Sequence, residues 1–196
     1  MTKVSFNPRT TAYPMPVVLV GATVDGRPNF MAVAWFSKVN STPPMMISLG
    51  KKQYTGEGIK ENRSFSINLP GKDLVTETDY WGIVSGRTKD KARLFETFYG
   101  EPGNAPIIRG CPINYDLKLA ETVELPGTHL YIGEIVGAYV GQDKRQGHIP
   151  DVPQAEPFML VESPPNTYHH LGPQIADAFR VGKKLKPNPR RTELRP

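Results

Sequence analysis

Apolar and polar residues alternate along much of the chain, and the period of the alternation is that of a β-strand. Strands are predicted wherever apolar side chains recur at every second position or form short unbroken runs, at residues 16–24, 29–40, 45–50, 64–70, 114–125, 128–140 and 158–163. Within 64–70, Phe65, Ile67 and Leu69 alternate with small polar residues, which predicts a half-buried strand.

Turn residues join these strands into hairpins. Asp25-Gly26 separates the first two predicted strands, and Pro126-Gly127 separates 114–125 from 128–140. Because neighbouring strands follow one another directly, an antiparallel sheet closed into a barrel is favoured over a stack of βαβ units.

Helices are predicted mainly in the polar middle of the chain. One short helix is expected in 51–62, where two glycines weaken it, and two more in 72–82 and 88–98, on either side of a break at Ser85-Gly86. A last short helix is expected within 167–182. The fold class is therefore mainly β with a few short helices.

Composition supports one globular domain, and charge adds a distinct tail. The 196 residues include 18 glycines and 20 prolines, which suit a turn-rich, strand-rich fold. Six cations and one acid lie from Lys183 onward, which accounts for the whole net charge of +5. We therefore predict a domain over 1–182 and a basic, Pro-rich tail over 183–196. The neutral body argues against nucleic-acid binding.

Several classes of site and location are disfavoured. The single cysteine, Cys111, excludes an internal disulfide and a zinc cluster, and it is expected to be a small buried side chain. No metal site is expected, and the adjacent His169 and His170 are assigned to the surface. The sequence shows no signal peptide and no apolar run long enough to span a membrane, so a cytoplasmic location is expected. Phosphate-loop and Rossmann glycine motifs are missing as well.

Three groups of residues could bind a ligand. Residues 29–54 combine an apolar wall with hydroxyls, amides and cations on adjacent strands, as a flat ring carrying a phosphate would require; a solvated hairpin end is the alternative, and composition alone favours it. Ser85-Gly86 with Arg87, Lys89 and Lys91 would form an anion site if it opened a helix, or merely a capped surface helix. His129 could donate to a ligand or face water.

The order of several sequence blocks along the chain favours ligand binding over the alternatives for these three groups. PVVLVGATVDGRPN, AVAWFSKVNSTPPMMISL, KKQYTGEGIKENRSFSINLP, TDYWGIVSGRTKDK and ETVELPGTHLYIGEIV, spread over roughly residues 10–182, resemble the FMN-binding split-barrel flavin reductase-like family, and its flavoredoxin branch in particular. The resemblance implies a Greek-key split β-barrel homodimer with one non-covalent FMN per protomer near the subunit interface.

The resemblance also implies which residues hold the cofactor. Residues 32–42 would line the ring and ribityl chain, Ser48 to Tyr54 would reach the phosphate, and His129 would lie near the ring. The implied FMN-binding residues are Ala32, Val33, Ala34, Trp35, Ser37, Lys38, Asn40, Ser41, Thr42, Ser48, Lys51, Lys52, Tyr54, Ser85, Gly86, Lys91 and His129.

Two positions depart from the family pattern. Flavoredoxin-like chains often carry cysteine where Trp81 stands, so no thiol chemistry is expected there. Flavin reductases often have a Thr-Ala-Ser run where Ala32-Val33-Ala34 stands, which leaves more of the contact to the backbone.

Two functions remain open at this point. The first is an FMN-dependent oxidoreductase that receives electrons from NAD(P)H or from a redox protein. The second is a non-catalytic module of the same shape that senses or binds flavin or haem.

Overall fold

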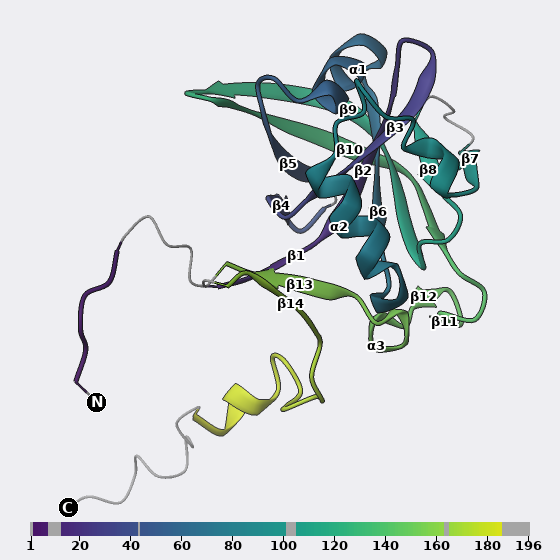
Figure 1. The fold of residues 1–196 in the computed structure, drawn as a ribbon. Helices are drawn as coiled ribbons and strands as arrows, with labels where there is room; N and C mark the ends of the chain where they lie inside the picture. Colours follow the sequence, from purple (N-terminus) through teal and green to yellow (C-terminus); the bar gives the residue numbers. More distant parts are fainter. Residues whose placement is uncertain (1, 8–12, 43, 101–104, 163–164, 186–196) are drawn as a thin grey trace, which may run out of the picture.

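Antiparallel strands form most of the computed structural model, which describes residues 2–7, 13–42, 44–100, 105–162 and 165–185 (Figure 1). The main sheet has seven strands in the order β3-β2-β6-β9-β10-β5-β4. They are β2 (Val18–Val24), β3 (Arg27–Val33), β4 (Phe36–Lys38), β5 (Pro44–Gly50), β6 (Ser64–Leu69), β9 (Ile113–Leu125) and β10 (Thr128–Val140). The sheet curls into a split barrel, so the predicted fold class is confirmed.

Smaller elements surround this sheet. A second sheet pairs β1 (Pro14–Pro16), β13 (Phe158–Val161) and β14 (Thr167–His170), and two short ribbons pair β7 (Thr97–Tyr99) with β8 (Pro106–Ile108) and β11 (Arg145–Gln146) with β12 (Ile149–Pro150). The helices are α1 (Tyr54–Asn62), α2 (Val75–Ile83) and α3 (Val152–Ala155), with 3-10 turns at Lys72–Leu74, Ala92–Leu94 and Val181–Leu185.

Strand β2 is buried on both faces, which explains its unbroken apolar sequence. Val18, Val20 and Ala22 face the main core inside the curled sheet, where Ile59 of α1 also packs. Leu19 faces a second cluster, in which Phe30 and Trp81 join the sheet to α2. The two helices thus cover opposite faces of the same strands.

The two predicted hairpins are confirmed. Asp25 and Gly26 have φ values of 49° and 70°, as a tight turn between β2 and β3 requires. The prediction for 29–40 as one strand is wrong, because the chain breaks after Val33. Phe36 N–H donates to Ala34 O (3.0 Å) in a local turn, and β4 begins only afterwards.

Some of the predicted helices are confirmed and others are wrong. Residues 54–62 and 75–83 are helical, but 88–98 contains only a 3-10 turn followed by β7. Within 167–182, residues 167–170 form β14 instead, where His169 and His170 are exposed as expected. Cys111 is buried, at 2% exposure.

The glycines of α1 permit close packing and are not a weakness. A Cβ at Gly58 would lie 2.2 Å from the Thr23 carbonyl oxygen, and one at Gly56 would lie 2.9 Å from the Tyr131 hydroxyl. Only glycine lets this helix approach β2 and β10 so closely.

Strand β6 is not half-buried as predicted, because its polar face is covered too. Ser66 and Asn68 are both fully buried. The Asn68 amide donates to Leu19 O (2.9 Å), and its oxygen accepts from Ile108 N–H (2.9 Å) and Asn114 Nδ2 (2.8 Å). This network holds the β7–β8 ribbon against the barrel.

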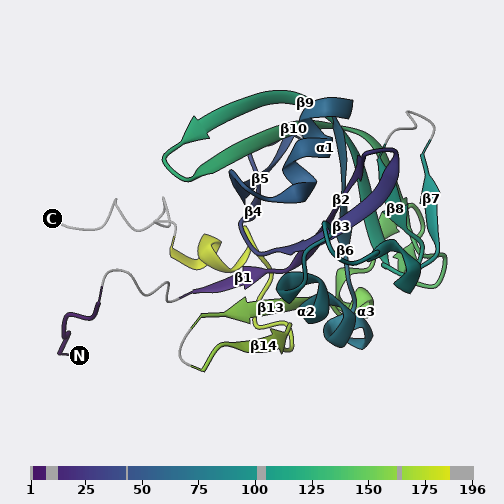
Figure 2. The ribbon, with the colours of Figure 1, turned by 45° about the horizontal axis from the view of Figure 1, so that its top comes forward.

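Both ends of the described chain extend away from the barrel. Figures 1 and 2 show residues 2–7 and the segment after β14 on the side where the β1–β13–β14 sheet projects. The division at 182/183 remains a prediction, since residues 186–196 of the basic tail lie outside the described residues.

Candidate functional site

Three adjoining hollows follow β3 and the start of α1. The inner hollow, of about 200 Å³, is lined by Met31, Ala32, Val33, Ala34, Trp35, Ser48, Leu49, Gly50, Gln53 and Glu162. The middle hollow, of about 50 Å³, is lined by Asn29, Met31, Gln53, Tyr54, Thr55, Trp81, Gly82, Val84, Ser85, Gly86 and Lys91. The outer hollow, of about 230 Å³, is lined by Val24, Arg27, Pro28, Asn29, Tyr54 and residues 86–91.

Shared residues make these hollows one trough. Met31 and Gln53 line both the inner and the middle hollow, while Asn29, Tyr54 and Lys91 line both the middle and the outer one. Along β3, Asn29 and Val33 are separated by about 13 Å at the usual rise of a strand. The trough therefore has the length of a flat ring system joined by a short chain to a phosphate.

The inner hollow is an apolar shelf created by the break after β3. The Phe36 turn described above redirects the chain, and Ser48 N–H of β5 donates to Trp35 O (2.9 Å). These bonds hold Ala34 and Trp35 at the rim, and Trp35 remains 54% exposed. Such a surface suits one face of a planar ring and leaves an edge open to solvent.

In the middle hollow, the loop after α2 lies directly on β3. A Cβ at Gly86 would fall 1.9 Å from Asn29 Oδ1, so only glycine fits there. Asn29 cannot move aside easily, because it is 5% exposed and its Nδ2 donates to Thr55 Oγ1 (2.7 Å). Ser85-Gly86 is thereby fixed beside the first turn of α1.

Lys91 is a buried cation at the junction of the middle and outer hollows. It is 4% exposed, and its ammonium donates to Trp81 O (3.1 Å) and Val84 O (2.9 Å) at the end of α2. No carboxylate of the described residues pairs with it. Burial lowers the pKa of Lys91 to about 8.

A buried charge without a counter-charge is costly, so this position favours an anionic ligand. The carbonyl oxygens use two of the three donors of the ammonium, which leaves one for a ligand. Trp81 Nε1, also buried in the wall of the middle hollow, has no acceptor among the described residues. Both observations fit a ligand whose oxygens end here.

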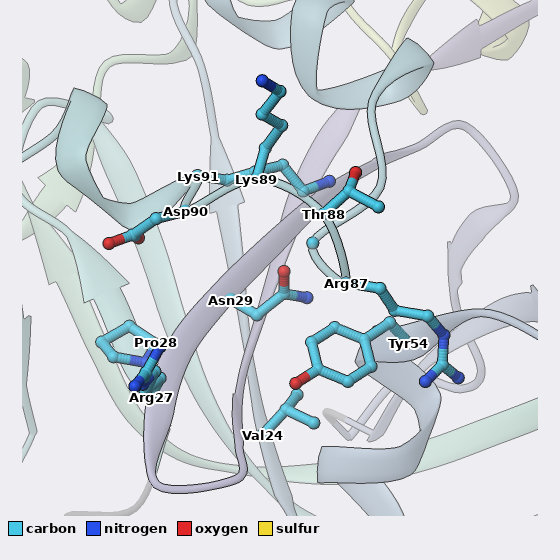
Figure 3. A pocket seen from close by; sticks show the side chains of 11 residues that line it. Val24, Arg27, Pro28, Asn29, Tyr54, Arg87, Thr88, Lys89, Asp90 and Lys91 are labelled. Carbon is cyan, nitrogen blue, oxygen red and sulfur yellow. The ribbon is translucent and has the colours of Figure 1, made fainter.

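The outer hollow has cations around its rim (Figure 3). The guanidinium of Arg87 lies 4.8 Å above the centre of the Tyr54 ring and forms an ion pair with Glu57. The Tyr54 hydroxyl donates to Asp25 Oδ2 (2.8 Å), and this hydrogen bond, with burial, raises the pKa of Tyr54. The β2–β3 hairpin, α1 and the loop after α2 thus meet at this hollow.

The trough gathers part of the predicted site. Predicted residues that line it are Ala32, Val33, Ala34, Trp35 and Ser48 in the inner hollow and Tyr54, Ser85, Gly86 and Lys91 farther out. The helix start predicted at Ser85-Gly86 is wrong, because this pair follows α2 and does not begin a helix, and the anion site there stays a prediction.

The other predicted residues lie outside the three hollows. They are Ser37 and Lys38 on β4, the exposed Asn40, Ser41 and Thr42, the exposed Lys51 and Lys52, and His129 on β10. Lys51 forms an ion pair with Glu124, and His129 Nε2 lies 3.4 Å from Lys60 Nζ. The single chain therefore does not bring these side chains to the trough.

Sequence reasoning missed the polar floor of the trough. Asn29 and Thr55 form it, and each looks unremarkable in the sequence because its partner is distant along the chain. The Arg27-Pro28-Asn29 run after the Asp25-Gly26 turn was the available signal, since a buried asparagine needs a partner across the fold.

Within the described ranges, no three His, Cys, Asp or Glu side chains come close enough together to bind a metal ion. None of the helices there is both long and apolar enough to cross a membrane.

Comparisons with known proteins place the chain. It matches the flavin reductase-like domain over residues 10–161. Flavoredoxin from Methanosarcina acetivorans is 41% identical, with a TM-score of 0.90 over 94% of this chain and 100% of that one. Flavoredoxin of Desulfovibrio vulgaris (Miyazaki F) is 35% identical, with a TM-score of 0.85 over 92% and 100%.

A more distant relative differs in length. An uncharacterized protein of Aeropyrum pernix is 30% identical over 139 residues, which are 69% of this chain and 53% of that protein, so the match spans about half of the relative's length.

The family match covers most of the chain and includes every residue of the trough except Glu162. The chain therefore belongs to the flavin reductase-like family.

Proposed function

We propose that this protein is an FMN-dependent oxidoreductase that passes electrons through a non-covalently bound flavin. The observation that carries the proposal is the trough, which joins an apolar shelf to a buried lysine without a counter-charge. Riboflavin would leave that lysine unmatched, whereas the phosphate of FMN would pair with it. Flavoredoxins of 41% and 35% identity support the redox part of the proposal.

Each part of the trough has a binding task in this proposal. Ala32 to Trp35 would support the ring in the inner hollow, and Ser85, Gly86 and Lys91 would hold the phosphate. When bound, the flavin supplies the hydride or electron transfer. The chain's contribution is to bind, orient and partly exclude water, while the open side near Trp35 leaves an edge of the ring accessible to a donor.

The electron donor is proposed to be NAD(P)H or a redox protein, and one experiment separates the two. The purified protein is examined by absorbance under anaerobic conditions, alone and with NADH, NADPH or a reduced protein donor. Bands of oxidised flavin are expected. Rapid bleaching by a nicotinamide nucleotide indicates a flavin reductase, and bleaching only by a reduced protein indicates a carrier.

Two outcomes would contradict the proposal. If the purified protein is colourless and also fails to bind added FMN, the proposal of a flavin cofactor is wrong. A tightly bound flavin that none of the donors reduces would favour the sensing module over the oxidoreductase.

We also propose that the protein acts as a homodimer. Its support is the segment after β14, in which Ile175 is 99% exposed and Phe179 is 97% exposed. Apolar side chains so fully exposed are expected to pack against another surface. A second copy of this chain is the simplest source of that surface, because most soluble oligomers are symmetric pairs of one chain.

A further inference from the structure

An acidic side chain lies in the inner hollow, where the flavin ring is proposed to bind. Among the described residues that line this hollow, Glu162 alone carries a charge. We propose that the Glu162 carboxylate lowers the reduction potential of the bound flavin and so makes the reduced protein a stronger electron donor. This inference rests on the proposed function, because it takes the ring to lie on Ala32 to Trp35.

The projecting sheet carries Glu162 to the hollow. Glu162 directly follows β13, which pairs with β1, and β1 leads into β2, the partner of β3. Figure 2 shows β1 and β13 side by side, next to the curled sheet. The family match ends at residue 161, so the family assignment does not extend to this side chain.

The charge of Glu162 is not balanced within the hollow. Glu162 is half-buried and forms no ion pair with any described residue. Lys91 lines the middle and outer hollows and is proposed to pair with the phosphate. Lys51 and Lys52 lie outside the inner hollow, and Glu124 engages Lys51. The described lining of the inner hollow is therefore net negative.

Reduction changes the charge of the ring, so a nearby carboxylate acts on one redox state more than on the other. A hydride, or two electrons with one proton, leaves the ring with one additional negative charge. Glu162 repels that charge, whereas the oxidised ring is neutral. Near a protein surface, repulsion between like charges about 10 Å apart changes an equilibrium constant about tenfold. Glu162 should therefore weaken the binding of reduced FMN by about this factor.

Potentiometric titration of the full-length, FMN-loaded protein measures this effect. Glu162→Gln removes the charge and keeps the shape, and Glu162→Lys inverts the charge. The control is Glu134→Gln, because Glu134 is exposed on β10 and lines none of the three hollows. The potential is expected to rise by about 30 mV in Glu162→Gln, which is a tenfold change for two electrons, and by about 60 mV in Glu162→Lys. The control should match the wild type.

Binding of the two redox states gives an independent measurement of the same effect. The flavin-stripped protein is titrated anaerobically with oxidised FMN and with FMN reduced beforehand by dithionite. In Glu162→Gln, the affinity for oxidised FMN is expected to change less than about twofold, while reduced FMN binds about tenfold more tightly. The ratio of the two affinities must agree with the measured shift in potential.

The outcomes separate this inference from the proposed function. Equal potentials in the wild type and both Glu162 variants would overturn the inference and leave the flavin oxidoreductase intact. So would equal losses of affinity for oxidised and reduced FMN, which would show that Glu162 only shapes the hollow. Slower reduction at an unchanged potential would assign Glu162 to proton transfer and also contradict the inference.

Failure of the wild type to bind FMN in either redox state would overturn the proposed function, and the inference with it. Thermal unfolding midpoints of the wild type and the three variants confirm that the substitutions leave the fold intact.

Discussion

The proposed binding of the phosphate depends mainly on one side chain, Lys91. Replacing it with methionine keeps much of its length and removes its charge. Charge-assisted hydrogen bonds contribute about 1.5–3 kcal/mol, so Lys91→Met is expected to weaken FMN binding roughly tenfold to a hundredfold. Riboflavin, which has no phosphate, should bind both proteins alike, and fluorescence titration measures both ligands. Equal losses for FMN and riboflavin would show that Lys91 supports the fold and not the phosphate.

The same lysine predicts a pH dependence of binding. Burial lowers the pKa of Lys91 to about 8, and a bound phosphate favours its charged form. FMN affinity should therefore fall as pH rises through about 8. Riboflavin binding, and FMN binding to Lys91→Met, should be flat across the same range. A decline of equal size in the variant would assign the effect to another group.

In the flavin-free protein, the pH dependence of stability has the opposite sign to the pH dependence of FMN binding. The pKa is about 8 in the fold and 10.5 as the ordinary value, so the unfolded chain binds more protons between these limits. The unfolding free energy contributed by Lys91 therefore rises with pH across this window. Urea unfolding of wild type and Lys91→Met at matched pH values measures the difference, and identical slopes would contradict it.

The wall of the inner hollow was predictable because the sequence keeps its residues together. Ala32 to Trp35 lie in one run, and the structure keeps them on one shelf. Lys51 looked equally suited to a phosphate, but a partner 73 residues away, Glu124, engages it. Asn29 was missed because its partner Thr55 lies on another element. Pairings between distant segments decide these cases, and a single sequence does not display them.

At the scale of elements, the loop between α2 and the Ala92–Leu94 turn shapes the part of the trough where the phosphate is proposed to bind. Gly86→Ala would drive a methyl group into Asn29, so the loop must lift away from β3. We expect a folded protein with a lower thermal midpoint and at least tenfold weaker FMN binding. Differential scanning fluorimetry and flavin titration measure the two effects.

A matched glycine makes this prediction specific. A Cβ at Gly110 would meet Phe95 only at an ordinary contact distance, 3.7 Å, and Gly110 lies outside the trough, so Gly110→Ala should leave both the midpoint and FMN binding unchanged. The account of the loop would be wrong if Gly86→Ala bound FMN as tightly as Gly110→Ala does.

Elements were predictable where local pattern and tertiary packing agree. The alternation in 114–125 and 128–140 gave β9 and β10 with nearly correct bounds, because one face of each packs on the core. Residues 88–98 carry a helix-like pattern of charges, yet Lys91 turns inward to the end of α2 and Phe95 packs edge-on against Trp81 (4.7 Å). These two contacts override the local preference for a helix.

At the scale of the whole molecule, the segment after β14 is the feature that one chain leaves unexplained. Phe179 has a φ of 61°, an unfavourable value for a non-glycine residue, and almost its whole side chain is exposed. Within the described residues, nothing apolar covers it or Ile175. Contacts with a second copy would offset both the strain and the exposure.

This explanation predicts how the oligomer responds to substitution. Burying each of Ile175 and Phe179 contributes about 1.5–3 kcal/mol, so replacing both with serine should raise the dimer dissociation constant about a hundredfold or more. Sedimentation equilibrium measures that constant, with Ile149→Ser, an isoleucine 71% exposed on β12, as the control. If the wild type is a monomer at micromolar concentration, or if the double variant dimerises as tightly as the control, the segment does not form the interface. Because Glu162 of the inner hollow directly follows β13 in the projecting sheet, loss of the dimer should also speed FMN release.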